Sequence, residues 1–230
     1  MATAGVLRAV GVRKAFRGPG GRGPEILRGV DLTLMPGEYV AVTGRSGSGK
    51  STLLNILGGL DRPDAGDLSF GGQSLVRASR RTLAHFRAHH LGFVFQQFHL
   101  IASLTAWENV MLAARYRGRD PSDAARTAMR LFERLGIAER RDAYPPALSG
   151  GEQQRVAFCR AALNDPAVIL ADEPTGNLDE ANAAVVVEQL RERAHEFGAA
   201  VLLVTHSHSL ARTADRIWQL ADGALRGLAG

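Results

Sequence analysis

Apolar positions along the 230-residue chain fall into short runs that polar or glycine-rich stretches separate. Runs of this length are typical of buried strands, whereas residues 26–34 alternate as in a half-buried strand. These patterns predict strands at residues 6–10, 26–34, 39–43, 91–96, 167–172 and 200–205, and a closing hairpin of residues 217–221 and 224–228. The glycine-rich residues 18–23 predict a mobile loop that is neither helix nor strand.

Helical patterns fill much of the remaining chain. Helices are predicted at residues 51–58, 151–163 and 181–197, with another after residue 205. Asp120 followed by Pro121 marks a helix start, because the carboxylate can cap the helix and Pro fits its first position. The apolar stripe of that helix consists of Ala124, Ala128, Leu131, Phe132 and Leu135, and Gly136 ends it. Alternating strands and helices predict an α/β fold with a parallel sheet, into which residues 98–148 insert a helical region.

Composition places the chain among ordinary water-soluble domains. Apolar residues make up 45% and charged residues 22%, and no run approaches the roughly 20 apolar residues of a membrane-spanning helix. No signal peptide is expected near Arg8 and Arg13. The single cysteine, Cys159, indicates a reducing compartment and is interpreted as a core residue. We therefore expect a cytoplasmic protein.

The net charge of +5 and isoelectric point of 10.1 raise the possibility of a nucleic-acid partner. The basic residues are spread over the chain, and aromatic residues are not interleaved with them as on a base-stacking surface. We therefore expect no nucleic-acid partner. The 28 basic residues include only two lysines, and one of these, Lys50, closes a glycine-rich loop.

Residues 44–51, Gly-Arg-Ser-Gly-Ser-Gly-Lys-Ser, follow a predicted strand and precede a predicted helix. This spacing in this context is typical of a phosphate-binding loop, because glycines let several backbone N–H groups point at one anion. The helix start adds partial positive charge. Lys50 can reach the β- and γ-phosphates, and the Ser51 hydroxyl can bind magnesium. The loop predicts binding of a nucleoside triphosphate, without naming a reaction.

Two adjacent carboxylates, Asp172 and Glu173, end the apolar strand at residues 167–172. Open α/β sheets place ligands at this end of their strands. Because successive strand residues point to opposite sides, we expect the two carboxylates to have different tasks. Asp172 is predicted to hold magnesium through water, and Glu173 to polarise the attacking water.

Residues 148–155, Leu-Ser-Gly-Gly-Glu-Gln-Gln-Arg, predict a second helix start of unusual composition. Ser149 and Glu152 form a capping box, yet the glycines between them each cost roughly 1 kcal/mol against Ala in a helix. A plain cap does not need them, whereas bare backbone at a helix N-terminus can bind an anion. Two such sites and one triphosphate suggest that two copies of the chain share a nucleotide.

These motifs resemble those of the ABC ATPases over about residues 5–225. Residues 148–155 are similar to the family signature, and Gln96, Asp179 and His206 match its glutamine loop, D-loop and switch histidine. The resemblance implies a phosphate-loop NTPase (RecA-like) core with a mostly parallel sheet, an N-terminal antiparallel β-subdomain and an inserted helical subdomain. It further implies one ABC ATPase domain over residues 1–230, with the core at 1–96 and 161–230 and the helical signature subdomain at 97–160.

The resemblance also implies the roles of individual residues. Glu173, His206 and Lys50 are the expected catalytic residues. Ser51, Gln96 and Asp172 are the expected Mg²⁺ ligands. The expected ATP contacts are Phe16 stacked on adenine, then Gly44, Arg45, Ser46, Gly47, Ser48, Gly49, Lys50, Ser51, Thr52 and Gln96, and, closing over a partner's nucleotide, Ser149, Gly150, Gly151 and Asp179.

Residues 95–101, 104–110 and 171–179 are similar to one subgroup, the lipoprotein-release, macrolide-export and cell-division ATPases of bacteria. The resemblance implies a homodimer that drives a transmembrane permease by mechanical transmission, at the inner face of the cell membrane. We hypothesise that exposed Leu100, Ile101 and Trp107 form the docking surface. Charge substitutions there would then weaken complex formation.

Three alternatives remain at this point. A soluble ABC ATPase that acts on ribosomes or DNA usually carries two cassettes or long insertions. A phosphate-loop kinase or GTPase would leave residues 148–155 and His206 without a purpose, and no guanine-reading Asn-Lys-x-Asp tetrapeptide occurs. A non-hydrolysing regulator fits poorly with the intact Glu173.

Overall fold

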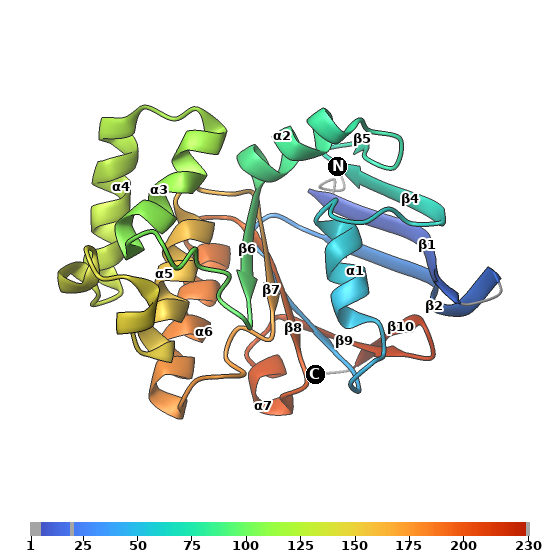
Figure 1. Ribbon diagram of the computed structural model, residues 1–230. Helices are drawn as coiled ribbons and strands as arrows, with labels where there is room; N and C mark the ends of the chain where they lie inside the picture. Colours follow the sequence, from blue (N-terminus) through green and yellow to red (C-terminus); the bar gives the residue numbers. More distant parts are fainter. Residues whose placement is uncertain (1–5, 19–20, 229–230) are drawn as a thin grey trace.

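The computed structural model describes residues 6–18 and 21–228, and Figure 1 shows two sheets with helices around them. The larger sheet has the order β10-β9-β3-β8-β7-β6. Its strands are β3 (Tyr39–Thr43), β6 (Leu91–Phe95), β7 (Val168–Asp172), β8 (Ala200–Thr205), β9 (Arg216–Ala221) and β10 (Ala224–Leu228). All neighbours pair in parallel except β9 and β10, which form the expected hairpin. The predicted α/β class and mostly parallel sheet are confirmed.

The smaller sheet is antiparallel and contains the N-terminal strands. It has the order β2-β1-β4-β5, built from β1 (Leu7–Gly18), β2 (Gly21–Leu34), β4 (Ala65–Phe70) and β5 (Gln73–Ser74). The predicted loop at residues 18–23 is wrong for most of its length, because Gly18 pairs with Gly21 at the end of the β1–β2 ladder. Backbone hydrogen bonds alone can extend a ladder, even where glycine disfavours a strand. Residues 19 and 20 lie outside the described residues.

Helices cover both faces of the larger sheet (Figure 1). α1 (Lys50–Leu57) lies on one face, while α5 (Gly150–Ala162) and α6 (Glu180–His195) lie on the other. α3 (Ala106–Arg117), α4 (Pro121–Arg134) and the short turns η1 (Ala138–Arg140) and η2 (Pro145–Ala147) stand with α5 in the region where we predicted helices. α2 (Arg80–His90) and α7 (His208–Ala211) complete the fold, and α2, β4 and β5 belong to a stretch for which no element was predicted.

Two apolar cores lie on the two sides of the larger sheet. Within β7, Ile169 and Ala171 pack into the core shared with α3–α6, whereas Val168 and Leu170 pack into the core shared with α1 and the smaller sheet. Cys159 is fully buried in the first core, as expected, and burial raises the pKa of its thiol. This double burial explains why the central strands are continuous apolar runs.

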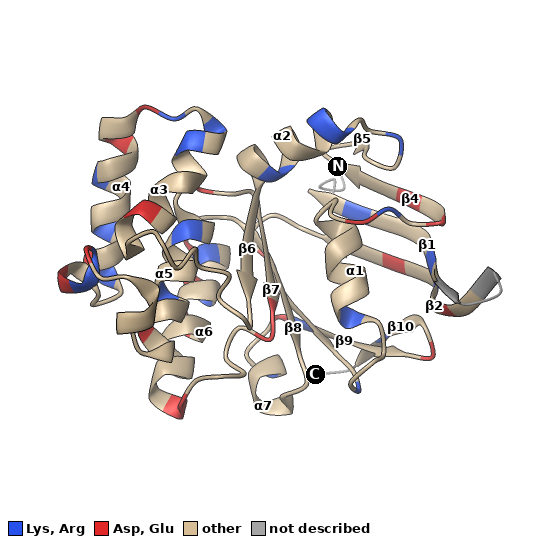
Figure 2. Ribbon diagram, viewed as in Figure 1, with Lys and Arg blue, Asp and Glu red and all other residues tan. Residues whose placement is uncertain are grey.

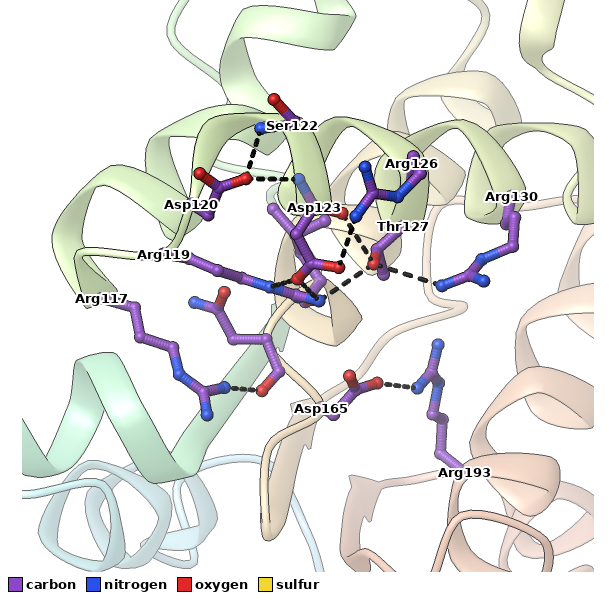
Figure 3. Close-up of polar contacts among 12 residues, drawn as sticks. Arg117, Arg119, Asp120, Ser122, Asp123, Arg126, Thr127, Arg130, Asp165 and Arg193 are labelled. Carbon is purple, nitrogen blue, oxygen red and sulfur yellow. Dashed lines mark hydrogen bonds and ion pairs between the residues drawn. The ribbon is translucent and has the colours of Figure 1, made fainter.

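Arginine side chains join the α3–α4 connection to the end of α5 (Figure 3). Arg119 donates to the carbonyl of Leu163 and pairs with Asp123, and Arg117 donates to the carbonyl of Asn164. Carbonyls at a helix end have no partner within the helix, so cations are favourable there. Part of the basic excess therefore serves internal contacts. Among residues 6–18 and 21–228, none of the helices has the length and hydrophobicity of a membrane span.

Candidate nucleotide-binding site

The carboxyl ends of four parallel strands open into one cavity of about 450 Å³. β3 leads into the phosphate loop, β6 leads to Gln96, β7 ends at Asp172, and β8 is followed by His206. The cavity is lined by Phe16, Ile26, Ser46, Gly47, Gly49, Lys50, Ser51, Thr52, Gln96, Asp172, Glu173 and His206. The fold thus brings together residues that lie up to 190 positions apart in the chain, as parallel sheets do at their ligand-binding edge.

The phosphate loop wraps around the Lys50 ammonium group. Lys50 Nζ donates to the carbonyls of Gly44 at 2.8 Å and Arg45 at 3.0 Å. These two residues and Ser48 do not line the cavity, so their predicted nucleotide contacts are not apparent in this arrangement. An ammonium group has three donors, so one remains for a phosphate oxygen. The loop therefore presents a preorganised cation at the start of α1.

Gly49 must be glycine for two reasons. Its φ is +100°, a left-handed conformation that side chains rarely adopt. A Cβ at this position would also lie 2.6 Å from Ile26 Cγ2. Ile26 lines the cavity but was predicted only as part of a strand face. Its role could not be read from the chain, because it depends on how β2 lies over the loop.

Asp172 and Glu173 both line the cavity, contrary to the expectation that they point to opposite sides. β7 ends at Asp172, and Glu173 has a φ of +45°, so the alternation of strand side chains stops between them. Burial raises the pKa of Asp172, the Ser51 hydroxyl opposes this shift through a hydrogen bond, and the neighbouring Glu173 reinforces it. The positive φ thus aims the second carboxylate at the same space as the first.

Glu173 is held by two groups from the end of β8. Thr205 Oγ1 donates to Glu173 Oε2 at 3.1 Å, and His206 Nδ1 lies 2.8 Å from Glu173 Oε1. The Glu173 side chain is 16% exposed, whereas His206 is 70% exposed. Sequence reasoning gave Thr205 no role beyond preceding His206. The arrangement orients a carboxylate that can accept a proton from water and keeps an imidazole beside it.

The second predicted anion site lies outside this cavity. Ser149, Gly150, Gly151 and Asp179 are not among the lining residues. At the start of α5 the predicted capping box is present: Glu152 N donates to Ser149 Oγ at 3.3 Å, and Ser149 N donates to Glu152 Oε2 at 2.7 Å. The Ser149 N–H donor holds the pKa of Glu152 below its ordinary value. One chain therefore carries two separate glycine-bearing helix starts.

Phe16 and Gln96 reach the cavity from different sheets. Phe16 lies in β1 with half of its surface exposed, and it lines the cavity as expected for a stacking residue. Gln96 follows β6 directly and also lines the cavity. A cavity with a half-exposed aromatic ring, a phosphate loop and two carboxylates is that of a phosphate-loop nucleoside triphosphatase.

Comparison with known proteins assigns the chain more narrowly. The family model described as ABC transporter matches residues 27–176, and the chain belongs to this family. It is 46% identical to the lipoprotein-releasing system ATP-binding protein LolD of Shewanella frigidimarina, over 89% of this chain and 86% of that protein. It is 47% identical to the macrolide export ATP-binding/permease protein MacB 1 of Aeromonas hydrophila, over 96% of this chain but only 34% of that protein.

Solved structures of one ABC cassette have the same fold as this chain. The dimeric structure of MJ0796, a bacterial ABC transporter cassette, has a TM-score of 0.90 and 36% identity, covering 97% of this chain and 99% of that chain. A second structure of that cassette, at 35% identity and the same TM-score, is a dimer in a post-hydrolysis state bound to ADP and Pi. As a member of this family, the chain is an ATP-binding ATPase. The match also supports dimerisation.

Proposed function

We propose that two copies of this chain close around two ATP molecules and that this closure drives a separate transmembrane permease from the cytoplasmic side of the membrane. One observation carries the proposal: the phosphate-loop cavity and the glycine-bearing start of α5 are separate sites in one chain. A second copy in antiparallel orientation would place each α5 start over the other copy's triphosphate. Such an isologous pair yields two equal sites.

The chain's own groups suit the steps of hydrolysis. Phe16 stacks on adenine, and the loop N–H groups with Lys50 bind the phosphates. Glu173, held by Thr205 and His206, orients water in line with the γ-phosphate and accepts its proton. Lys50 and His206 stabilise the charge that develops on the transferred phosphoryl group.

Three residues that line the cavity fit magnesium. Ser51, Gln96 and Asp172 offer a hydroxyl, an amide oxygen and a carboxylate, which are the oxygen ligands that this ion prefers. The Ser51 hydroxyl lowers the pKa of Asp172 against the effect of burial, and both residues line the same cavity. Bound there, Mg²⁺ would supply positive charge to the β- and γ-phosphate oxygens.

Gly150→Glu tests the shared site. A Cβ at Gly150 would have its nearest neighbour, Asn177 O, at 3.7 Å, so the chain can fold with a side chain there. The substitution should leave ATP binding to the single chain unchanged, since Gly150 does not line the cavity. It should abolish ATP-dependent dimerisation, because the added carboxylate repels the partner's triphosphate. Light scattering with ATP, in a Glu173→Gln background, measures this.

A matched control is Gly227→Glu, at an exposed position of β10 where a Cβ also meets only ordinary contacts. It should dimerise like the parent. Dimerisation of the Gly150→Glu chain would show that the start of α5 does not face a nucleotide. Loss of ATP binding by the single chain would contradict the separation of the two sites.

For the permease we propose a docking groove of about 550 Å³ between α2, α3 and α5. Its lining combines apolar and basic side chains: Arg81, Ala84, His85, Arg87, Ala88, His89, Leu91, Ala113, Tyr116, Arg160, Ala161 and Asn164. Figure 2 shows blue Lys and Arg positions along the ribbons of α2 and the neighbouring helices. The charge favours a partner segment with apolar and acidic side chains.

The groove connects to the nucleotide cavity through Arg160. This side chain donates to the carbonyls of Phe98 at 2.8 Å and His99 at 2.6 Å, just after Gln96. The surface hypothesised from the sequence fits less well. Ile101 is 47% exposed, but Leu100 and Trp107 pack against the core, where the Trp107 ring lies 5.8 Å from that of Phe132.

Combined Arg81→Glu and Tyr116→Glu should abolish copurification with the permease co-expressed with this chain. Both positions are exposed, and Tyr116 is 78% exposed, so ATP turnover of the isolated chain should not change. Arg226→Glu, in β10 away from the groove, is the control for reversal of a surface charge and should copurify normally. Retained copurification of the double variant would place docking elsewhere, with Ile101→Glu as the next variant.

A further inference from the structure

Asn182 connects two motifs that belong to different helices. It lies in the first turn of α6, where its Nδ2 donates to Asp179 Oδ2 at 2.7 Å. Its Oδ1 accepts from Arg155 Nη1 of α5 at 2.5 Å. The Asn182 backbone N–H also donates to Asp179 Oδ1 at 2.8 Å. The amide therefore uses both of its ends, and rotating it would break a bond at each.

The start of α5 packs directly on this amide. A Cβ added to Gly151 would lie 2.5 Å from both Cγ and Oδ1 of Asn182. A side chain at Gly151 would therefore collide with Asn182 of the same chain. This is a second reason for glycine there, besides leaving the backbone open to a nucleotide. The close approach fixes how far the first turn of α5 stands from α6. Arg155 fixes the same distance one turn further on.

The segment before Asp179 contacts the nucleotide cavity. A Cβ on Gly176 would lie 2.8 Å from Gln96 Nε2, and Asn177 Nδ2 donates to the carbonyl of Gln96 at 3.1 Å. Residues 176–179 therefore touch a cavity residue at one end and bind Asn182 at the other. Through Asn182, the position of the α5 start is tied to the cavity of the same chain.

We propose that Asn182 is a positioning residue that sets the α5 start relative to residues 176–179. On this basis Asn182 contacts no nucleotide itself, but the α5 start meets the second copy's nucleotide only while the Asp179–Asn182–Arg155 chain of bonds is intact. The inference rests on the proposed function, since it assumes that two copies share each ATP. It assigns Arg155 a task as well: holding the amide from the α5 side.

Asn182→Ala tests this in the Glu173→Gln background. ATP affinity of the single chain should stay unchanged, because Asn182 does not line the cavity. The dimer dissociation constant at saturating ATP should rise about tenfold or more, since a hydrogen bond to a charged group is lost on each side. With Glu173 present, kcat should fall by a similar factor while KM changes little. Gln189→Ala, which removes an amide elsewhere on α6, should change neither dimerisation nor kcat.

A double-mutant cycle with Arg155→Met separates positioning from general destabilisation. If the bond to Asn182 is the route, Asn182→Ala should add little to the dimerisation defect of Arg155→Met. Fully additive effects, or unimpaired dimerisation of Asn182→Ala, would overturn the inference. So would parallel losses of ATP affinity and melting temperature. Failure of the Glu173→Gln parent itself to dimerise with ATP would instead contradict the proposed function.

Discussion

Replacing Glu173 by Gln is expected to slow ATP turnover by about 10²–10⁴-fold, the range typical of a lost general base. The amide can still accept from Thr205 Oγ1, which lies 3.1 Å from Glu173 Oε2, so the side chain should keep its place. It can no longer take a proton from water. ATP should therefore bind normally and persist, and the dimer should accumulate. Phosphate release and size-exclusion chromatography with ATP measure the two effects.

Glu180→Gln is the matched control for this substitution. Glu180 lies in the exposed first turn of α6, outside the cavity, so the same chemical change there should leave turnover unaltered. Unchanged turnover in Glu173→Gln would mean that another group activates the water. His206 would then be the group to test, since its ring lies beside Glu173 in the same cavity.

Replacing Lys50 by Ala should weaken ATP binding about ten- to a hundredfold. Hydrogen bonds between charged groups contribute roughly 1.5–3 kcal/mol each, and Lys50 is the charged side chain that the loop encloses. The change also removes the donor that binds the carbonyls of Gly44 and Arg45, so the loop loses part of its own support. Turnover and ATP-dependent dimerisation should fall together with affinity. Isothermal titration with ATP gives the affinity directly.

The chain offers one other lysine for comparison. Lys14 pairs with Asp61 at 2.9 Å and does not line the cavity, so Lys14→Met should leave ATP affinity unchanged. A Lys50→Ala chain that bound ATP as tightly as the parent would contradict the assignment of the loop. Unfolding curves of the Lys50→Ala chain distinguish a loss of ATP binding from a folding defect.

The strands that consist of strong apolar runs were predictable from the sequence. β3, β7 and β8 are buried on both faces, so their sequences are continuous apolar runs with turn residues at each end. Asp120 caps α4 as expected, accepting from the N–H groups of Ser122 and Asp123. The elements without a prediction have weaker patterns: α2 buries only Leu83 and Phe86, and β4 buries only Leu68.

The β1–β2 ladder shows a different limit of prediction from sequence. Its glycine-rich end carries no apolar pattern, yet Gly18 pairs with Gly21. Backbone hydrogen bonds are insensitive to side-chain pattern, so periodicity cannot detect them. Periodicity also could not place Ile26 against Gly49, because this contact depends on β2, a strand of the other sheet, lying over the loop.

The sequence by itself determined the chemistry of this protein: a phosphate loop at residues 44–51, two carboxylates after a buried strand, and a second glycine-bearing helix start. These features are local, because each depends on residue types at short spacing. Only the tertiary structure decided that Asp172 and Glu173 share one cavity, since a positive φ at Glu173 overrides strand alternation. It likewise placed Asn182 against Gly151, a contact between helices that no local pattern encodes.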